Sequence, residues 1–265
     1  MKKRVISAIV MGAIFIPIFI IGRIPFVVAI ALLGAQAYRE MISLKDNKFP
    51  VYIEVFGLLL MEYLIVANSI HVGAINVGVS YLPLALTFLL FGIPAIFNKK
   101  GDYTTKDAFY IGGVVLFLGV FFSAVSSIFI DNKWLFLYLI LIAVMTDTFA
   151  MLIGCLIGKH KLIPAVSPKK SVEGSVAGSL VATIVGTIYY VNLISADTNI
   201  LLILVVTLGL SILGQLGDLF FSKIKRENDV KDFSNIMPGH GGVLDRLDSL
   251  AFITLFYIIL MGVLA

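Results

Sequence analysis

The stretch WLFLYLILIAVMTDTFAMLIGCLI (residues 134–157) carries one charged side chain, Asp147, in an otherwise apolar run. A helix of about 20 apolar residues is long enough to cross the hydrocarbon core of a bilayer. The run therefore predicts a membrane-spanning helix. The whole chain has the same character, because 60% of its 265 residues are hydrophobic, 14% are charged and its mean hydropathy is +1.04. We expect an integral membrane protein without a separate soluble domain.

Polar breaks divide the apolar sequence into nine expected spans. These cover residues 5–22, 25–43, 51–69, 81–97, 109–130, 134–157, 174–194, 200–221 and 247–264. The first run resembles a signal peptide, but it is long and no small-residue cleavage pattern precedes Arg23, so we expect a retained helix. The predicted fold is all-α, a polytopic integral membrane protein with about nine transmembrane helices.

The basic residues predict the orientation of these spans. If the N-terminus is cytoplasmic, the inner segments hold 18 of the 20 lysines and arginines, and only Arg23 and Lys133 lie outside. This split follows the positive-inside rule. If one span in the middle were miscounted, the basic residues after it would change sides and the split would be lost. We expect a cytoplasmic N-terminus and an outer C-terminus. The net charge of +4 needs no nucleic-acid partner, because the basic residues orient the chain.

Two aspartates lie within apolar runs: Asp147 in TDTF (146–149) and Asp218 in GDLF (217–220). A carboxylate in hydrocarbon costs about 2.5–3.5 kcal/mol on insertion scales, so it usually faces a cavity or a partner. Both are site candidates, and the alternative is that each pairs with a nearby lysine for packing alone. The single cysteine, Cys155, is expected to act as a small apolar residue.

Charged residues become frequent after residue 217. From Asp218 to Asp248 the chain carries six acidic and five basic residues, which excludes a simple polybasic patch for anionic headgroups. Carboxylates suit a hard cation such as Mg²⁺, which takes one or two carboxylates and completes its shell with water and substrate phosphates. No cluster of cysteine or histidine residues suggests zinc. The segment therefore predicts a magnesium site.

The spacing of these acids is compatible with helix faces. Asp218, Ser222 and Lys225 follow each other at i, i+4 and i+7, so they share a face if the eighth span continues past the membrane interface. Asp245 and Asp248, at i and i+3, also share a face. The alternative for this second pair is that both merely complement the dipole at the start of the ninth span.

A glycine-rich turn, Pro238-Gly239-His240-Gly241-Gly242, precedes the ninth span. Three glycines let backbone amides approach a ligand closely, and amides that lead into a helix N-terminus form a natural seat for phosphate. A structural re-entry loop is the alternative. His240 could contact phosphate or orient a carboxylate, and a packing role is the alternative for this side chain.

A second segment, SPKKSVEG (167–174), places Lys169 and Lys170 beside hydroxyl side chains just before the seventh span. These lysines are candidates for binding phosphate. The alternative is ordinary anchoring of the chain on the positive side of the membrane.

The stretch SKIKRENDVKDFSNIMPGHGGVLDRLD (222–248) resembles the signature of the phosphatidate cytidylyltransferases, also called CDP-diacylglycerol synthases. The similarity continues upstream through GDL (217–219), TDTFA (146–150) and SPKKSVEG, so it covers roughly residues 140–255. Met237 departs from the signature, where leucine, isoleucine or phenylalanine is usual. The first four spans are similar only in hydropathy.

The resemblance implies transfer of a cytidylyl group from CTP to phosphatidic acid, with CDP-diacylglycerol and pyrophosphate as products. It implies Mg²⁺, one ion or two, as the cofactor. It also implies an N-terminal region of transmembrane helices (1–130) and a C-terminal catalytic region (131–265) with cytoplasmic loops 158–173 and 222–246. The implied metal ligands are Asp218, Asp245 and Asp248, with Asp147 as a second candidate.

Lys225 and Arg226 join these aspartates as expected catalytic residues. The expected substrate-binding residues are Lys169, Lys170, Ser222, Lys231, Gly239, His240, Gly241, Gly242 and Arg246. The expected partners are CTP, phosphatidic acid and bilayer lipid, with no nucleic acid, and a second copy of the chain is a further candidate. We expect the protein in a cytoplasmic membrane of bacterial type, with its active site on the cytoplasmic side.

Two other functions remain open at this point. A CTP-dependent polyprenol or phytol-type lipid kinase would use the same nucleotide and break a different bond. A cation-coupled membrane transporter could use the same intramembrane aspartates, but it gives no reason for a long charged loop in one half of the chain only.

Overall fold

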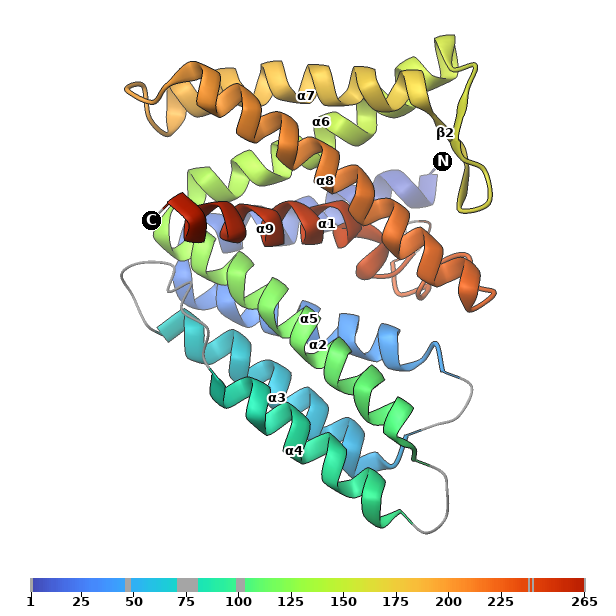
Figure 1. Cartoon of the computed structure of the whole chain (residues 1–265). Helices are drawn as coiled ribbons and strands as arrows, with labels where there is room; N and C mark the ends of the chain where they lie inside the picture. The colour runs from blue at the N-terminus through green and yellow to red at the C-terminus, as the bar shows by residue number, and fades with distance from the viewer. Residues whose placement is uncertain are drawn as a thin grey trace. The chain divides into compact units, whose positions relative to one another are not determined.

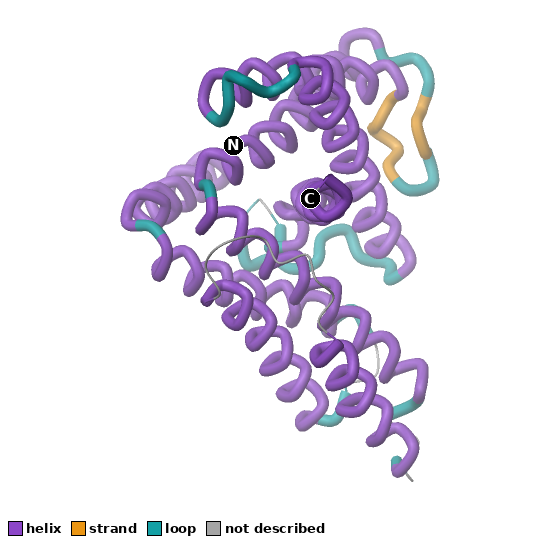
Figure 2. Tube along the Cα trace, turned by 60° about the vertical axis from the view of Figure 1, so that its left-hand side comes forward, coloured by secondary structure: helices purple, strands orange, loops and turns teal. Residues whose placement is uncertain are grey.

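The computed structural model describes residues 2–45, 49–70, 81–98, 103–237, 239 and 241–264, and within these residues helices dominate (Figure 1). The helices are α1 (Lys2–Ile21), α2 (Arg23–Ile42), α3 (Val51–Ile70), α4 (Tyr81–Phe97), α5 (Thr105–Asp131), α6 (Lys133–Ile157), α7 (Val172–Leu193), α8 (Ile200–Glu227) and α9 (Leu244–Leu264). Strands β1 (Lys161–Ile163) and β2 (Ser167–Ser171) form an antiparallel hairpin between α6 and α7 (Figure 2). The all-α prediction is confirmed for the described residues, where a short hairpin accompanies the helices.

Hydropathy supports membrane insertion of this fold. Among the described residues, five helices are long and apolar enough to cross a bilayer, namely α2, α5, α6, α7 and α8. Shorter apolar stretches run from Gly12 to Ile21 and from Leu82 to Phe97. The protein is therefore an integral membrane protein built from apolar helices.

Local capping explains where several helices begin. The side chain of Asn132 accepts hydrogen bonds from the amides of Trp134 (2.9 Å) and Leu135 (3.3 Å) at the start of α6. Ser171 caps α7 by accepting from the amide of Gly174 at 3.2 Å. Because these side chains satisfy amides that the helix leaves open, the chain turns into helix at these residues.

The chain forms two compact units. One contains residues 1–131 together with 232–244, and the other contains residues 132–231 together with 245–265. In the first unit, α5 supplies much of the core through buried side chains such as Ile111, Val115 and Phe122. Phe26 of α2 stacks on Phe129 of α5 with ring centroids 3.6 Å apart.

Small residues bring α6 and α7 together in the second unit. A Cβ atom at Gly178 would lie 2.5 Å from the carbonyl oxygen of Thr146, and one at Gly174 would lie 2.4 Å from that of Ala150. Only glycine permits this approach, which is how transmembrane helices commonly pack.

Polar side chains join α7 and α8 in the same unit. Gln215 Nε2 donates to Ser179 Oγ at 2.7 Å, and Ser211 Oγ donates to the same hydroxyl at 3.0 Å. Thr146 of α6 shares a 2.7 Å hydrogen bond with Ser211. These buried bonds fix the rotation of the three helices, and therefore the direction in which Asp147 and Asp218 point.

Candidate functional site

The candidate site lies in the second unit, where α8 packs closely against α9. A Cβ atom at Gly217 would lie 2.6 Å from the carbonyl oxygen of Asp248 and 2.9 Å from Cβ of Phe252. One at Gly214 would lie 2.8 Å from Cδ1 of Ile253. The glycines at these positions allow the two helices to touch, and this contact brings Asp218 near Asp248.

Three of the predicted aspartates come together from three helices. The carboxylate of Asp248 on α9 interacts electrostatically with those of Asp218 on α8 and Asp147 on α6. Ser249 Oγ donates to Asp147 Oδ2 at 3.2 Å, and the amide of Ser249 donates to Asp248 Oδ1 at 2.8 Å. Asp147 is exposed and Asp218 and Asp248 are partly exposed, so a cation from solution can reach carboxylates that repel one another and reduce this repulsion.

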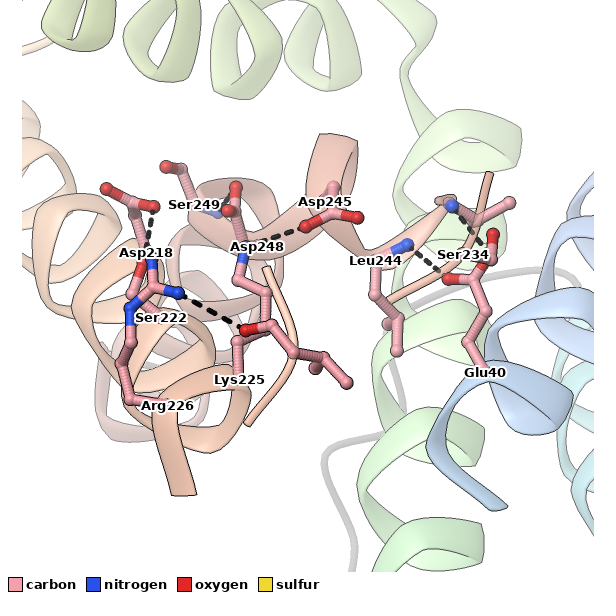
Figure 3. A network of polar contacts seen from close by, with 12 residues as sticks. Glu40, Asp218, Ser222, Lys225, Arg226, Ser234, Leu244, Asp245, Asp248 and Ser249 are labelled. Carbon is pink, nitrogen blue, oxygen red and sulfur yellow. Dashed lines mark hydrogen bonds and ion pairs between the residues drawn. The ribbon is translucent and has the colours of Figure 1, made fainter. Parts of the chain in front are cut away.

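Two lysines supply positive charge at this cluster. The ammonium group of Lys225 donates to Asp245 Oδ1 at 2.6 Å, and the two side chains are 10% and 3% exposed (Figure 3). Lys170 forms an ion pair with Asp218, and both of these side chains are about one-fifth exposed. Two lysine–aspartate ion pairs thus lie in the second unit, and together they offer ammonium groups for phosphate and carboxylates for a metal ion.

The helical face predicted for α8 exists because this helix continues to Glu227 rather than ending near residue 221. Ser222 Oγ lies 3.5 Å from Asp218 Oδ1, at the limit of a hydrogen bond, and Lys225 follows one turn later. An ion pair between Lys223 and Glu227, at i and i+4, supports the added turns (3.1 Å).

The β hairpin presents Lys170 to Asp218. Glu173, in the first turn of α7, accepts hydrogen bonds from the amide of Lys159 (3.1 Å) and from the ring of His160 (2.6 Å). These bonds tie the beginning of the hairpin to the beginning of α7. Neighbouring residues of a strand point in opposite directions, so Lys170 is half-buried at Asp218 while Lys169 is exposed.

The other predicted basic residues lie at the surface. Arg226, Lys231 and Arg246 are exposed. Arg226 Nη1 donates to the carbonyl of Val230 at 3.2 Å, and Arg246 interacts electrostatically with Asp147. None of the three belongs to the ion pairs Lys225–Asp245 and Lys170–Asp218.

The glycine-rich turn belongs to the first unit, in the segment 232–244. Gly239 and Gly241 have φ angles of 80° and 87°, a left-handed conformation that favours glycine. Met237 and Gly241 exchange backbone hydrogen bonds of 3.0 and 3.1 Å, which close the turn. Pro238 and His240 lie outside the described residues, so the prediction for His240 stays open.

One residue of this unit was not singled out by the sequence. Glu40, on α2, is 2% exposed and accepts hydrogen bonds from Ser234 Oγ at 2.7 Å and from the amides of Val243 and Leu244, both at 2.9 Å (Figure 3). An acid near a helix end looks like an ordinary interfacial residue. No motif or periodicity distinguishes Glu40, because two of its four donors are backbone amides, which leave no mark in the sequence.

The donor set at the cluster fits Mg²⁺ if the substrate completes the shell. Within the described part of the chain, no three aspartate, glutamate, histidine or cysteine side chains are close enough to hold a metal by themselves. Magnesium commonly takes only one or two carboxylates, and it fills its remaining positions with water and phosphate oxygens. Asp218 and Asp248, whose carboxylates interact electrostatically, could supply that number of ligands.

The known proteins that this chain resembles are cytidylyltransferases. Residues 2–264 match the model of a family described as the cytidylyltransferase family. The chain is 34% identical over 253 residues to the phosphatidate cytidylyltransferase of Staphylococcus haemolyticus (strain JCSC1435), and the matched region covers 96% of each chain. It is 31% identical over 265 residues to the phosphatidate cytidylyltransferase of Bacillus subtilis (strain 168), over 99% of this chain and 98% of the relative. The protein of the same name from Staphylococcus aureus (strain COL) is 33% identical over 259 residues.

Proposed function

Because the chain belongs to the cytidylyltransferase family, we propose that it transfers a cytidylyl group from CTP to phosphatidic acid, forming CDP-diacylglycerol and releasing pyrophosphate. The relatives named phosphatidate cytidylyltransferase, which match over nearly the full chain, support this substrate pair. The observation that carries the proposal is the presence of two lysine–aspartate ion pairs, Lys225–Asp245 and Lys170–Asp218. That arrangement offers separate binding groups for phosphate oxygens and for a cation.

The reaction itself needs charge neutralisation more than proton transfer. Phosphatidic acid carries a phosphate monoester, whose second pKa of about 6 leaves it largely dianionic near neutral pH. An oxygen of this phosphate attacks the α-phosphorus of CTP, and the bond from that phosphorus to the β-phosphate oxygen breaks. The electron pair of the broken bond leaves with pyrophosphate. No general base is required, so the absence of a catalytic triad from the proposed site residues is consistent with this chemistry.

Asp218 and Asp248, with Asp245 and with Asp147 as a second candidate, are the residues that would hold Mg²⁺. Bound there, the cation would neutralise phosphate charge and orient the oxygens in line. One ion or two would be compatible with the number of carboxylates.

The lysines have a second role in this proposal. Lys170 and Lys225 neutralise aspartates in the structure. Phosphate oxygens compete for the same ammonium groups, so binding of CTP or of the lipid phosphate would move each lysine from carboxylate to phosphate. Ser222 lies beside Asp218, where its hydroxyl could donate to the same ligands.

The exposed bases and the residues of the glycine turn are further proposed binding groups. Lys169, Arg226, Lys231 and Arg246 would attract the highly charged nucleotide from the cytoplasm. The turn at Gly239, His240, Gly241 and Gly242 would contribute to binding the substrates. How these groups are divided between CTP and the lipid stays a prediction.

We also propose the topology that places this site on the cytoplasmic side. Nine spans with a cytoplasmic N-terminus and an outer C-terminus put 18 of 20 basic residues inside. The lipid would then enter laterally from the bilayer while CTP arrives from water. Pairing of the chain with a second copy stays a prediction that light scattering of the purified protein would test.

Isotope labelling tests the reaction directly. Purified protein, phosphatidic acid, Mg²⁺ and CTP labelled at the α-phosphate should give a labelled lipid, whereas CTP labelled at the γ-phosphate should not. A lipid kinase offered a polyprenol or phytol alcohol would do the reverse and release CDP. Recovery of γ-label in the lipid would therefore overturn the assignment.

A further inference from the structure

The carboxylate of Glu40 on α2 is buried and accepts four hydrogen bonds within the first unit. It accepts from Ser234 Oγ (2.7 Å), from the amide of Val243 (2.9 Å) and from the amide of Leu244 (2.9 Å). Gln36, one turn earlier on α2, donates to the same carboxylate at 3.2 Å. A carboxylate that is 2% exposed is costly unless it is satisfied in this way.

The two amides belong to the point where the chain enters α9. The first turn of a helix leaves its amides without partners inside the helix, and their dipoles favour a negative charge. Usually a nearby side chain accepts from these amides. Here the acceptor lies about 200 residues earlier in the sequence, which makes Glu40 a long-range cap for this helix start.

The backbone of Gly242 packs directly against the Glu40 carboxylate. A Cβ atom at this residue would lie 2.6 Å from Glu40 Oε1 and 2.7 Å from Oε2. Unlike Gly239 and Gly241, Gly242 does not have a positive φ angle, so its backbone conformation is open to any residue. The close approach of Glu40 is therefore the physical reason for glycine at residue 242.

We propose that Glu40 is a positioning residue for cytidylyl transfer, which holds the segment 232–244 so that the chain enters α9 with Asp245 in the orientation that turnover requires. This inference rests on the proposed function, because it gives Asp245 a part in the reaction. Leu244, whose amide Glu40 binds, is joined to Asp245 by a single peptide bond. If the hydrogen bond from the Leu244 amide to Glu40 were lost, the backbone at Leu244 could shift, and the carboxylate of Asp245 would shift with it.

The Glu40→Gln variant tests the proposal with little change in volume. One carboxylate oxygen becomes an NH₂ group, which then faces the amide of either Val243 or Leu244 and cannot accept from it. Hydrogen bonds to a charged group contribute enough that we expect kcat to fall about tenfold or more, with the KM values for CTP and phosphatidic acid within about threefold of wild type. Hydrogen exchange should accelerate in the peptide that covers residues 232–244. The Glu40→Asp variant keeps the charge and should recover part of kcat.

Gly242 provides a second, independent test. Gly242→Ala alone should lower kcat, because its methyl group collides with the Glu40 carboxylate. In the double variant Glu40→Asp with Gly242→Ala, the shorter acid leaves room for the methyl group. The two substitutions should therefore cost less together than the product of their separate effects, and independent effects would contradict the contact.

Glu54→Gln on α3 is the matched control. It makes the same chemical change in the same unit, at a residue whose main-chain carbonyl accepts from Tyr38 Oη at 3.0 Å. We expect normal kcat and normal exchange in 232–244 for this variant.

The outcomes separate three explanations. Wild-type kcat in Glu40→Gln would overturn the proposal. Loss of activity with a lowered unfolding temperature and faster exchange throughout residues 2–131 would show a role in stability alone, and would also overturn it. If wild-type protein made no CDP-diacylglycerol, the proposed function would fail, and exchange in 232–244 would still decide whether Glu40 holds this segment.

Discussion

The ammonium nitrogen of Lys225 lies 2.6 Å from a carboxylate oxygen of Asp245, and both side chains are almost entirely buried. Lys225 belongs to the last turns of α8 and Asp245 to the first turn of α9. Each charge is compensated by the other at a place where water is scarce. Breaking such a pair at one side is far more costly than replacing both partners.

Single and double variants can therefore distinguish the contribution of this ion pair to stability from its contribution to catalysis. Lys225→Met leaves the buried carboxylate without this ammonium group, and we expect a loss of up to about 3–5 kcal/mol in the free energy of unfolding. The double variant Lys225→Met with Asp245→Asn should recover most of that loss, because no unbalanced charge remains. It should stay inactive, since both groups are needed for phosphate and metal. Thermal unfolding in detergent and labelled-lipid assays would measure the two effects, and an active double variant would contradict the assignment.

A second prediction concerns the metal site. Asp218→Asn keeps the side-chain volume but removes the charge that faces Asp248, so turnover should fall by about 10³-fold or more while the helical fold is retained. Activity of the wild type should vanish with EDTA and return with Mg²⁺. Circular dichroism and a Mg²⁺ titration of turnover would check both statements. A variant with full rate at every Mg²⁺ concentration would remove Asp218 from the site.

Asp229→Asn is the control for this substitution. Asp229 is exposed and has a φ angle of 52°, a left-handed conformation that asparagine tolerates. The variant therefore removes one negative charge from the loop that follows α8, without strain. We expect its turnover and its Mg²⁺ dependence to stay close to those of the wild type.

The apolar helices could be predicted from the sequence because a bilayer imposes a simple length and composition rule. The expected spans 134–157 and 200–221 correspond to α6 and to most of α8. Hydropathy missed the last turns of α8, because they carry charged residues that lie outside the apolar run. The spacing of Asp218, Ser222 and Lys225 predicted a common helix face on the condition that the helix continues past residue 221. It does continue, to Glu227.

Pairing between distant segments could not be predicted. Nothing in the sequence says that Lys170, rather than Lys169, meets Asp218, since that depends on the register of a short hairpin. Glu40 was missed for a related reason. Its donors include the amides of Val243 and Leu244, and a backbone amide has no signature in the sequence.

The two neighbouring lysines of β2 allow a matched comparison. Lys170 pairs with Asp218 and is half-buried, whereas Lys169 is exposed. We expect Lys170→Gln to lower kcat/KM for CTP by about tenfold or more, and Lys169→Gln to lower it less, in a way that added salt further weakens. Steady-state kinetics at low and high ionic strength would measure both. Equal effects of the two substitutions would contradict the register of the hairpin.

The last prediction concerns the orientation of the chain in the membrane. The split of basic residues predicts Lys231 in the cytoplasm and Lys133, the first residue of α6, outside. Cys155 is the only cysteine and is exposed, so a Cys155→Ala background removes the competing thiol. In that background we expect a cysteine at residue 133 to react with a membrane-impermeant maleimide in intact cells, and one at residue 231 to react only after the membrane is opened. Spans α6, α7 and α8 separate the two residues, and an odd number of crossings must place them on opposite sides. Labelling of both residues from the same side would therefore show that one of these helices does not cross the membrane, and would overturn the proposed topology.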